Sequence, residues 1–262
     1  MLLKLGGSVI TRKNGPARLR PKVLERLAGE IRDGASGPIV LLHGAGSFGH
    51  PGALRFHLTE PPRAGTGRQR ARGASIVAAE VRGLHRAVLA ALVRAGLSPW
   101  SVPPAPLAWN REGRLESLAT GPFAWAIGEG MVPVSFGDVV ADRSWGTSIL
   151  SADAIAVSLA RDLGLKRVLF ASDVDGVLVA APGAPGRPRI HPRVTPELLD
   201  RLIPAPGAPD ATGGIRGKIR AMLEISAMGA DAGIMSGLRH GTVAAALRGE
   251  TVYGSWSGAA PP

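Results

Sequence analysis

A small set of lysines is among the residues of this chain that could bind a ligand or take part in catalysis. Lysine accounts for only five of the 31 basic side chains, and arginine supplies the others. Three lysines lie in or beside glycine-rich turns, where a compact ammonium can act as a point charge on phosphate and the broad guanidinium of arginine fits less readily. These three are Lys4, Lys13 and Lys218. Their placement indicates that the turns bind phosphate.

Four glycine-bearing segments follow predicted strands or open a predicted helix. In a parallel α/β sheet, ligands gather beyond the carboxyl ends of the strands, where turns enter helices with unpaired backbone N–H groups. One such turn also serves ordinary folding, but four turns beside three of the five lysines indicate a site. The segments are Gly6-Gly7-Ser8, residues 44–49, Gly137-Asp138 and Thr212-Gly213-Gly214.

Two common phosphate-binding motifs fit this sequence poorly. Residues 44–49 match G-x-G-x-x-G, but a dinucleotide site needs an acidic residue about 20 positions later at a strand end. The chain offers Glu60, which is followed by two prolines in a predicted loop. A Walker A motif is excluded because Gly217-Lys218 is followed by Ile219, where a metal-binding hydroxyl belongs. A different phosphate cradle is therefore expected.

Composition narrows the classes of partner. The net charge of +11 favours anionic partners, but the basic residues are scattered and few aromatic side chains are available to stack on bases, so nucleic-acid binding is unlikely on this pattern. The chain has no cysteine, its six histidines show no metal-ligand spacing, and any metal is expected to arrive with a nucleotide. No apolar run reaches the roughly 18 residues that cross a bilayer, so no membrane association and a cytoplasmic location are expected.

The hydrophobic pattern alternates strands with helices along the whole chain. It predicts a three-layer α/β/α sandwich in a single domain, with a mainly parallel central sheet covered on both faces. Ser151 is a plausible N-cap for the helix that follows it. The predicted strands are 1–5, 38–44, 98–103, 132–140, 166–179, 231–236 and 250–256, and the predicted helices are 22–33, 67–96, 119–130, 151–164, 195–203, 215–229 and 242–249.

In order along the chain, the motifs resemble those of the amino acid kinase family, and within it those of the isopentenyl phosphate kinases. The resemblance covers nearly the whole chain and is much more specific than any single motif. The placement in the isopentenyl phosphate branch depends chiefly on His50, which ends the segment 43–50. The other motifs are Lys4-Leu5-Gly6-Gly7-Ser8 with Lys13, Gly137-Asp138, Ser151-Ala152-Asp153, residues 172–176, and residues 210–214 with Lys218.

This resemblance implies the amino acid kinase fold, with an acceptor-binding lobe at about 1–165 and a nucleotide-binding lobe at about 166–262. It also implies ATP as cosubstrate, with Mg²⁺ held mainly by ATP oxygens. Lys4 and Lys218 would hold the β- and γ-phosphates, with Asp153 fixing both ammonium groups, and Lys13 would stabilise the transferring phosphoryl group. The remaining nucleotide contacts would come from Gly6, Gly7, Ser8, Gly46, Asp173, Gly213 and Gly214.

On the acceptor side, the resemblance implies that His50 binds the acceptor phosphate. Backbone N–H groups near Ala45 and Gly46, and Gly137, would assist it. A phosphate acceptor is already a strong nucleophile, so His50 is assigned to binding and charge stabilisation and not to proton abstraction. Apolar residues of the predicted helix at 67–96, namely Ile76, Val77 and Val81, favour an acceptor with a hydrocarbon tail.

The chain departs from the family pattern in three segments. Alanines flank Asp153 where such kinases often carry glycine and a second aspartate, and Ala45 stands where glycine is usual. In the helix expected to line the acceptor pocket, the segment 73–77 begins with small residues where relatives can carry a bulky aromatic side chain. This difference predicts a roomier pocket that accepts chains longer than five carbons.

Other functions compatible with the sequence are a fosfomycin or other phosphonate kinase of the same fold, and a non-catalytic nucleotide sensor or nucleic-acid-binding protein. The presence of all three lysines and Asp153 argues against a silent sensor, because binding alone needs no transition-state lysine. By resemblance, a homodimer is expected.

Overall fold

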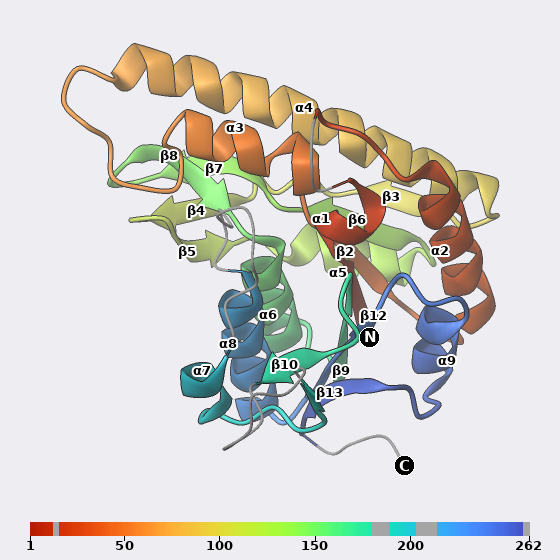
Figure 1. The fold of residues 1–262 in the computed structure, drawn as a ribbon. Coiled ribbons are helices and arrows are strands. Elements are labelled where there is room, and N and C mark those ends of the chain that lie inside the picture. Colours follow the sequence, from red (N-terminus) through yellow and green to blue (C-terminus); the bar gives the residue numbers. More distant parts are fainter. Residues whose placement is uncertain (13–15, 180–188, 203–213, 259–262) are drawn as a thin grey trace.

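The centre of the protein is a seven-stranded sheet. The computed structural model describes residues 1–12, 16–179, 189–202 and 214–258. The strand order is β13-β12-β9-β1-β2-β6-β3, and every neighbouring pair is parallel except β12 and β13 (Figure 1). The strands are β1 (Leu2–Leu5), β2 (Val40–His43), β3 (Pro99–Ser101), β6 (Val132–Phe136), β9 (Arg167–Ser172), β12 (Asp231–Ser236) and β13 (Gly254–Ser257).

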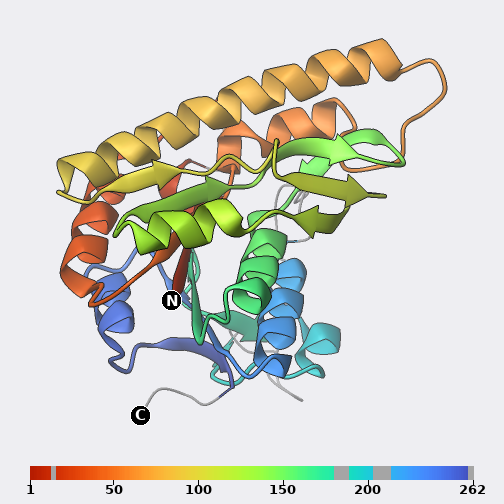
Figure 2. The ribbon, with the colours of Figure 1, turned by 180° about the vertical axis from the view of Figure 1, so that it is seen from behind.

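Helices cover both faces of this sheet, because alternate residues of its central strands face opposite ways. Leu2 belongs to the hydrophobic core on one face, and Leu3 belongs to the core on the other. The first face packs against α5 (Gly121–Gly128), α6 (Ala152–Asp162) and α8 (Gly214–Ala227). The second packs against α2 (Pro21–Gly34), α4 (Gly67–Arg94) and α9 (Thr242–Arg248) (Figure 2). The predicted three-layer α/β/α sandwich is confirmed.

A second, four-stranded sheet was not predicted. Its order is β5-β4-β7-β8, and it lies beneath α3 and the long α4 in Figure 1. The buried carboxylate of Asp142 holds its turns together by accepting hydrogen bonds from the Ser148 hydroxyl and from four backbone N–H groups. The strands are β4 (Ala108–Arg111), β5 (Arg114–Leu118), β7 (Asp138–Asp142) and β8 (Gly146–Leu150).

Two predicted strands are each divided in the structure. The strand predicted at 132–140 breaks at Gly137, where β6 leaves the main sheet and β7 enters the second one. The strand predicted at 166–179 ends at Ser172, and after a turn the chain continues as β10 (Val177–Val179), which pairs with β11 (Arg189–His191). An apolar run does not reveal where its hydrogen-bonding partner changes, so the prediction merged the pieces.

The other predicted elements are present within a few residues of their expected ends. Ser151 caps α6, its hydroxyl accepting the Asp153 N–H at 3.1 Å, as predicted. Among the described helices, none combines the length and apolar character needed to cross a membrane. Four short helices complete the fold, namely α1 (Gly7–Ile10), the 3-10 helix η1 (Gly46–Phe48), α3 (His50–Arg55) and α7 (Leu198–Arg201).

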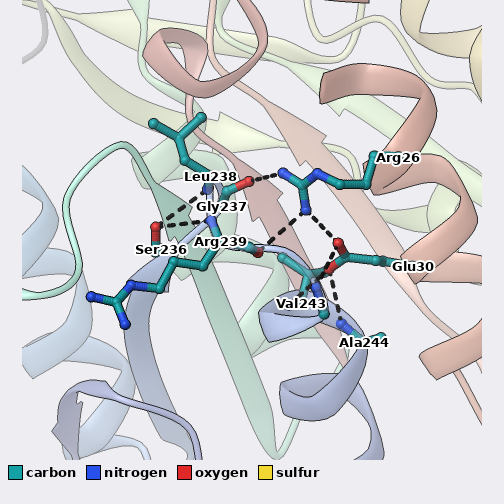
Figure 3. A network of polar contacts seen from close by, with 9 residues as sticks. Arg26, Glu30, Ser236, Gly237, Leu238, Arg239, Val243 and Ala244 are labelled. Carbon is teal, nitrogen blue, oxygen red and sulfur yellow. Dashed lines mark hydrogen bonds and ion pairs between the residues drawn. The ribbon is translucent and has the colours of Figure 1, made fainter. Parts of the chain in front are cut away.

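A partly buried pair on α2, Arg26 and Glu30, holds the loop between β12 and α9 (Figure 3). Helix α9 has no side-chain cap of its own, and the Glu30 carboxylate accepts the N–H groups of Gly241, Val243 and Ala244 at 3.0–3.4 Å. Arg26 donates to the Gly237 carbonyl at 2.6 Å and also contacts Glu30. Glu30 of α2 therefore caps the N-terminus of α9, in place of a cap from a residue next to α9 in the sequence.

Replacing Glu30 tests this tertiary cap. We expect Glu30→Ala to lower the free energy of unfolding by about 1–3 kcal/mol, because it leaves three N–H groups without their acceptor and Arg26 without its ion-pair partner. Glu25→Ala is the matched control. The Glu25 side chain lies on the same helix, is 59% exposed and makes only a long ion-pair contact, at 3.8 Å, with Arg94. Urea unfolding curves measure both losses, and equal losses in the two variants would contradict the cap.

Candidate active site

Three of the predicted glycine segments meet at the carboxyl ends of neighbouring strands. The parallel register aligns the ends of β1, β2 and β9 beside one another. Backbone hydrogen bonds extend this register into the loops, from Gly6 N to Ala171 O at 2.8 Å, from Gly44 N to Leu5 O at 2.9 Å and from Gly137 N to His43 O at 3.1 Å. The loops are thus fixed by the sheet that ends beneath them.

The first two glycine loops touch through their backbones. A Cβ atom on Gly7 would lie 2.3 Å from the nitrogen of Gly46, and one on Gly44 would lie 2.7 Å from the nitrogen of Gly7. Gly46 also has a φ of +52°, which other residues adopt at a cost. Only glycine permits this approach, and it leaves a cradle lined by backbone groups, as phosphate binding requires.

Thr11 joins these two loops, and the sequence analysis missed it. Its hydroxyl donates to the Gly7 carbonyl at 2.7 Å and accepts the Ser47 N–H at 3.1 Å, and the residue is fully buried. A Cβ on Gly46 would fall 2.2 Å from this hydroxyl. The sequence carries no signal for this role, because the two loops are joined only in the folded chain.

Lys4, Asp153 and Lys218 form a cluster, here called the lysine clamp. The alternation of β1 puts Lys4 on the face that α6 and α8 cover, opposite Phe170 in the register. The Asp153 Oδ1 atom lies 2.5 Å from the Lys4 ammonium nitrogen and 3.5 Å from that of Lys218. The predicted grouping of these three residues is thus seen in the structure.

The lysine clamp carries a net positive charge although Lys4 and Asp153 are buried. Burial lowers the pKa of Lys4 to about 8, with Asp153 opposing the shift and Lys218 adding to it. Burial alone would raise the pKa of Asp153, but Lys218 and Lys4 outweigh it and bring that pKa to about 2. Asp153 is therefore ionised at neutral pH, and one carboxylate faces two ammonium groups. Both ammonium nitrogens also lie over the Phe170 ring, at 5.9 and 5.4 Å from its centroid.

The predicted nucleotide contacts at the end of β9 also adjoin the first loop. Ser8 donates its hydroxyl hydrogen bond to Asp173 at 2.8 Å. Asp175, two residues on, makes a paired ion contact with Arg239 at 2.9 and 2.7 Å, and the loop of Arg239 is the one that Arg26 and Glu30 hold in Figure 3. Gly214 begins α8, which carries Lys218. Lys13 and Gly213 lie outside the described residues.

The predicted acceptor residues follow the end of β2. Ala45 and Gly46 lead into η1, and His50 is the first residue of α3. The predicted apolar wall of α4 is present in part, since Val77 and Val81 are buried in a small hydrophobic cluster with Leu58 and Phe136, whereas Ile76 is 37% exposed. Ile76 therefore does not line the interior, because it lies on the outward face of α4.

The space beside Gly73 is not vacant, contrary to the predicted roomier pocket. A Cβ on Gly73 would lie 2.2–2.6 Å from atoms of Phe56, which follows α3 and packs against the same cluster. An aromatic ring from another element thus fills the space beside Gly73. Sequence reasoning missed Phe56 because the two residues are joined only by tertiary packing.

Asp138, directly after Gly137, is a further buried carboxylate beside the acceptor residues. Burial raises its pKa to about 6, against the opposing effects of Arg82 and the Val139 N–H. Arg82 of α4 donates to it at 2.9 Å. This pair ties the start of β7 to α4, and the sequence analysis identified Asp138 only as part of a motif.

The site fits an anionic nucleotide better than a resident metal ion. Within the described ranges, no group of three or more potential ligand side chains could hold a metal. The backbone cradle and the clamp instead present N–H groups and ammonium groups, which are donors for phosphate oxygens. A divalent cation would therefore be coordinated mainly by the oxygens of the nucleotide.

The loop bridge made by Thr11 can be tested directly. We expect Thr11→Val to lower the free energy of unfolding by about 1–3 kcal/mol, because the Gly7 carbonyl and the Ser47 N–H lose a buried partner. Thr11→Ser keeps the hydroxyl and serves as the control. Urea unfolding measures both, and a valine variant as stable as the serine variant would contradict the bridge.

Comparison with known proteins agrees with this geometry. The model of the amino acid kinase family matches residues 1–236. Isopentenyl phosphate kinase of Methanothermobacter thermautotrophicus is 35% identical over 266 residues, covering 97% of each chain, and that of Thermoplasma acidophilum is 32% identical over 228 residues, covering 86% of each. A crystal structure of isopentenyl phosphate kinase superposes with a TM-score of 0.85 at 31% identity, covering 97% of this chain and 98% of the other. This chain belongs to the amino acid kinase family.

Proposed function

We propose that this protein is an ATP-dependent kinase that converts isopentenyl phosphate to isopentenyl diphosphate, a step of isoprenoid biosynthesis. The observation that carries the proposal is the lysine clamp, in which Asp153 holds the buried Lys4 and the partly buried Lys218 beside a backbone cradle. Phosphoryl transfer asks a protein mainly for positioning and charge neutralisation, and this arrangement supplies both. The named relatives support the choice of acceptor.

In the proposed reaction, an oxygen of the acceptor phosphate attacks the γ-phosphorus of ATP. A new P–O bond forms to the acceptor, the bond to the β-phosphate oxygen breaks, and ADP leaves with the bonding electron pair. Lys4 and Lys218 neutralise the β- and γ-phosphate oxygens, and N–H groups of Gly7, Ser8 and Gly46 hold them in place. Gly6 only shapes the turn, because its N–H bonds the Ala171 carbonyl and the predicted phosphate contact from it is wrong. Mg²⁺ bound to the nucleotide would add charge neutralisation. Lys13 would stabilise the phosphoryl group in transit.

The acceptor side needs no general base. An acceptor phosphate is ionised at neutral pH and already nucleophilic, so His50 acts by hydrogen bonding and charge stabilisation, with Ala45 and Gly46 as backbone partners. Gly137 can only line the site, because its N–H bonds the His43 carbonyl. The acceptor lies in the lobe at about 1–165, and the nucleotide, with Asp173, Gly213 and Gly214, in the lobe at about 166–262. These residue roles, the homodimer and the cytoplasmic location stay predictions.

The hydrophobic cluster beside the cradle favours an acceptor with a hydrocarbon tail. Val77 and Val81 of α4 and Phe56 pack next to η1 and α3. A small polar phosphonate such as fosfomycin would gain little from such a wall. The phosphonate kinase, the non-catalytic sensor and the nucleic-acid-binding protein therefore rank below the proposed function.

Coupled release of ADP tests the reaction. With Mg-ATP we expect strong turnover of isopentenyl phosphate and little of fosfomycin, and a fall of about 100-fold or more in His50→Ala, because a charge-stabilising donor is lost. His240→Ala is the matched control, since His240 is an exposed loop residue. Absence of turnover by the wild-type protein, or equal rates in the two variants, would contradict the proposal.

Chain-length selectivity tests the role of Phe56. We expect Phe56→Ala to improve kcat/KM for geranyl phosphate relative to isopentenyl phosphate by about tenfold, because the ring that fills the space beside Gly73 is removed. Ile76→Ala is the control, on the same α4 but at its outward face. An unchanged ratio in Phe56→Ala, or an equal change in both variants, would contradict this role.

A further inference from the structure

A chain of hydrogen bonds runs from the start of the glycine cradle to the edge of the sheet. His43, the last residue of β2, places its Nδ1 atom 3.2 Å from the carbonyl oxygen of Gly44. Its Nε2 atom lies 3.0 Å from Nδ1 of His85 in α4, and Nε2 of His85 lies 2.8 Å from the hydroxyl of Ser101 in β3. Three elements distant in sequence thus meet beneath the cradle.

Both histidines of this chain are buried and neutral. His43 is fully buried, His85 is 5% exposed, and the Phe136 ring packs against both imidazoles. Burial lowers the pKa of His43 to about 4. Burial, with smaller effects of His43 and Arg82, lowers that of His85 to about 3. At neutral pH each ring therefore carries one N–H and one acceptor nitrogen.

The positions of these protons follow from the one group that can only accept. The Gly44 carbonyl has no proton to give, so Nδ1 of His43 must be its donor. Nε2 of the neutral His43 is then an acceptor, which requires the proton of His85 to be on Nδ1. Nε2 of His85 in turn accepts the Ser101 hydroxyl proton. One arrangement of the protons therefore satisfies all three hydrogen bonds. In each bond the donor lies farther from the cradle than its acceptor.

This direction matters because the Gly44 carbonyl and the Ala45 N–H belong to one planar peptide unit. In a trans peptide the two groups point in opposite directions. A carbonyl held toward His43 therefore aims the Ala45 N–H away from the histidines. Glycine at position 44 offers little intrinsic resistance to rotation of this peptide, so the orientation depends on the hydrogen bond to His43.

We propose that His85 is a positioning residue, which acts through His43 to fix the Gly44–Ala45 peptide so that the Ala45 N–H faces the acceptor phosphate. This inference deepens the proposed function and depends on its assignment of Ala45 to the acceptor. His85 touches no substrate. Its contribution is the donor that keeps Nε2 of His43 unprotonated and Nδ1 protonated.

The wild-type protein gives the first test, by long-range ¹H–¹⁵N spectra of labelled histidine at pH 7. We expect His43 and His85 both to carry the proton on Nδ1, whereas free neutral histidine prefers the Nε2 form. Assignment uses the spectra of the two single variants. A proton on Nε2 of either ring, or a charged ring, would overturn the inference whether or not the enzyme phosphorylates isopentenyl phosphate.

The second test follows the Ala45 amide resonance during titration with inorganic phosphate in His85→Leu and His85→Asn. The asparagine amide can reproduce the donor that Nδ1 provides, and leucine cannot. We expect the Kd for phosphate to rise about tenfold in His85→Leu and to stay within about threefold of wild type in His85→Asn. Thermal melting verifies that each variant is folded.

Equal weakening in both variants, or none in either, would overturn the positioning role. Turnover assays keep the two proposals apart. A wild-type protein that has the expected proton positions but does not phosphorylate isopentenyl phosphate refutes the proposed function alone. Turnover with the protons on the other nitrogens refutes the inference alone.

Discussion

The sharing of one buried carboxylate between two ammonium groups, one buried and one partly buried, is the interaction on which this site depends. Removing an ion from water is costly, and a single Asp153 cannot neutralise both Lys4 and Lys218. The clamp thus keeps one formal positive charge at the carboxyl end of the sheet, and a polyphosphate chain is its natural complement. The three residues come from β1, α6 and α8, so the clamp requires the central sheet and both covering helices to be in place. Binding of an anion would therefore stabilise the packing of α8 against β1 and α6.

The backbone cradle beside the clamp imposes a second constraint. Loops that approach within van der Waals contact through glycines have little side-chain packing to hold them. The structure compensates with polar contacts from residues outside the loops, through the Thr11 hydroxyl on one side and the His43 imidazole on the other. Both supports are neutral, which suits their position, since a charged support would compete with the ammonium groups for the phosphate.

The sequence predicted the fold class and the approximate place of the site because those depend on local patterns. Alternating apolar runs indicated the main sheet, and Ser151 marked the start of α6 correctly. Most of the failures share one cause, which is dependence on contacts between distant segments. The missed β4–β5 hairpin is the exception, because its strands are joined by only Glu112 and Gly113. The break at Gly137 appears only when β6 and β7 are seen to pair with different sheets. Thr11 bridges two loops 36 positions apart, and nothing in its neighbours along the chain distinguishes it.

The predicted acceptor side also depends on a contact between distant segments, and this contact affects which substrates fit. Gly73 alone suggests extra room, and Phe56 alone suggests a filled wall, but the volume at this point is a property of the pair. Cores tolerate exchanges that conserve total volume, so a large residue on one element can be traded for a small one on its neighbour without changing the space that remains. Substrate length therefore has to be argued from summed volumes around the site, and not from single positions along α4.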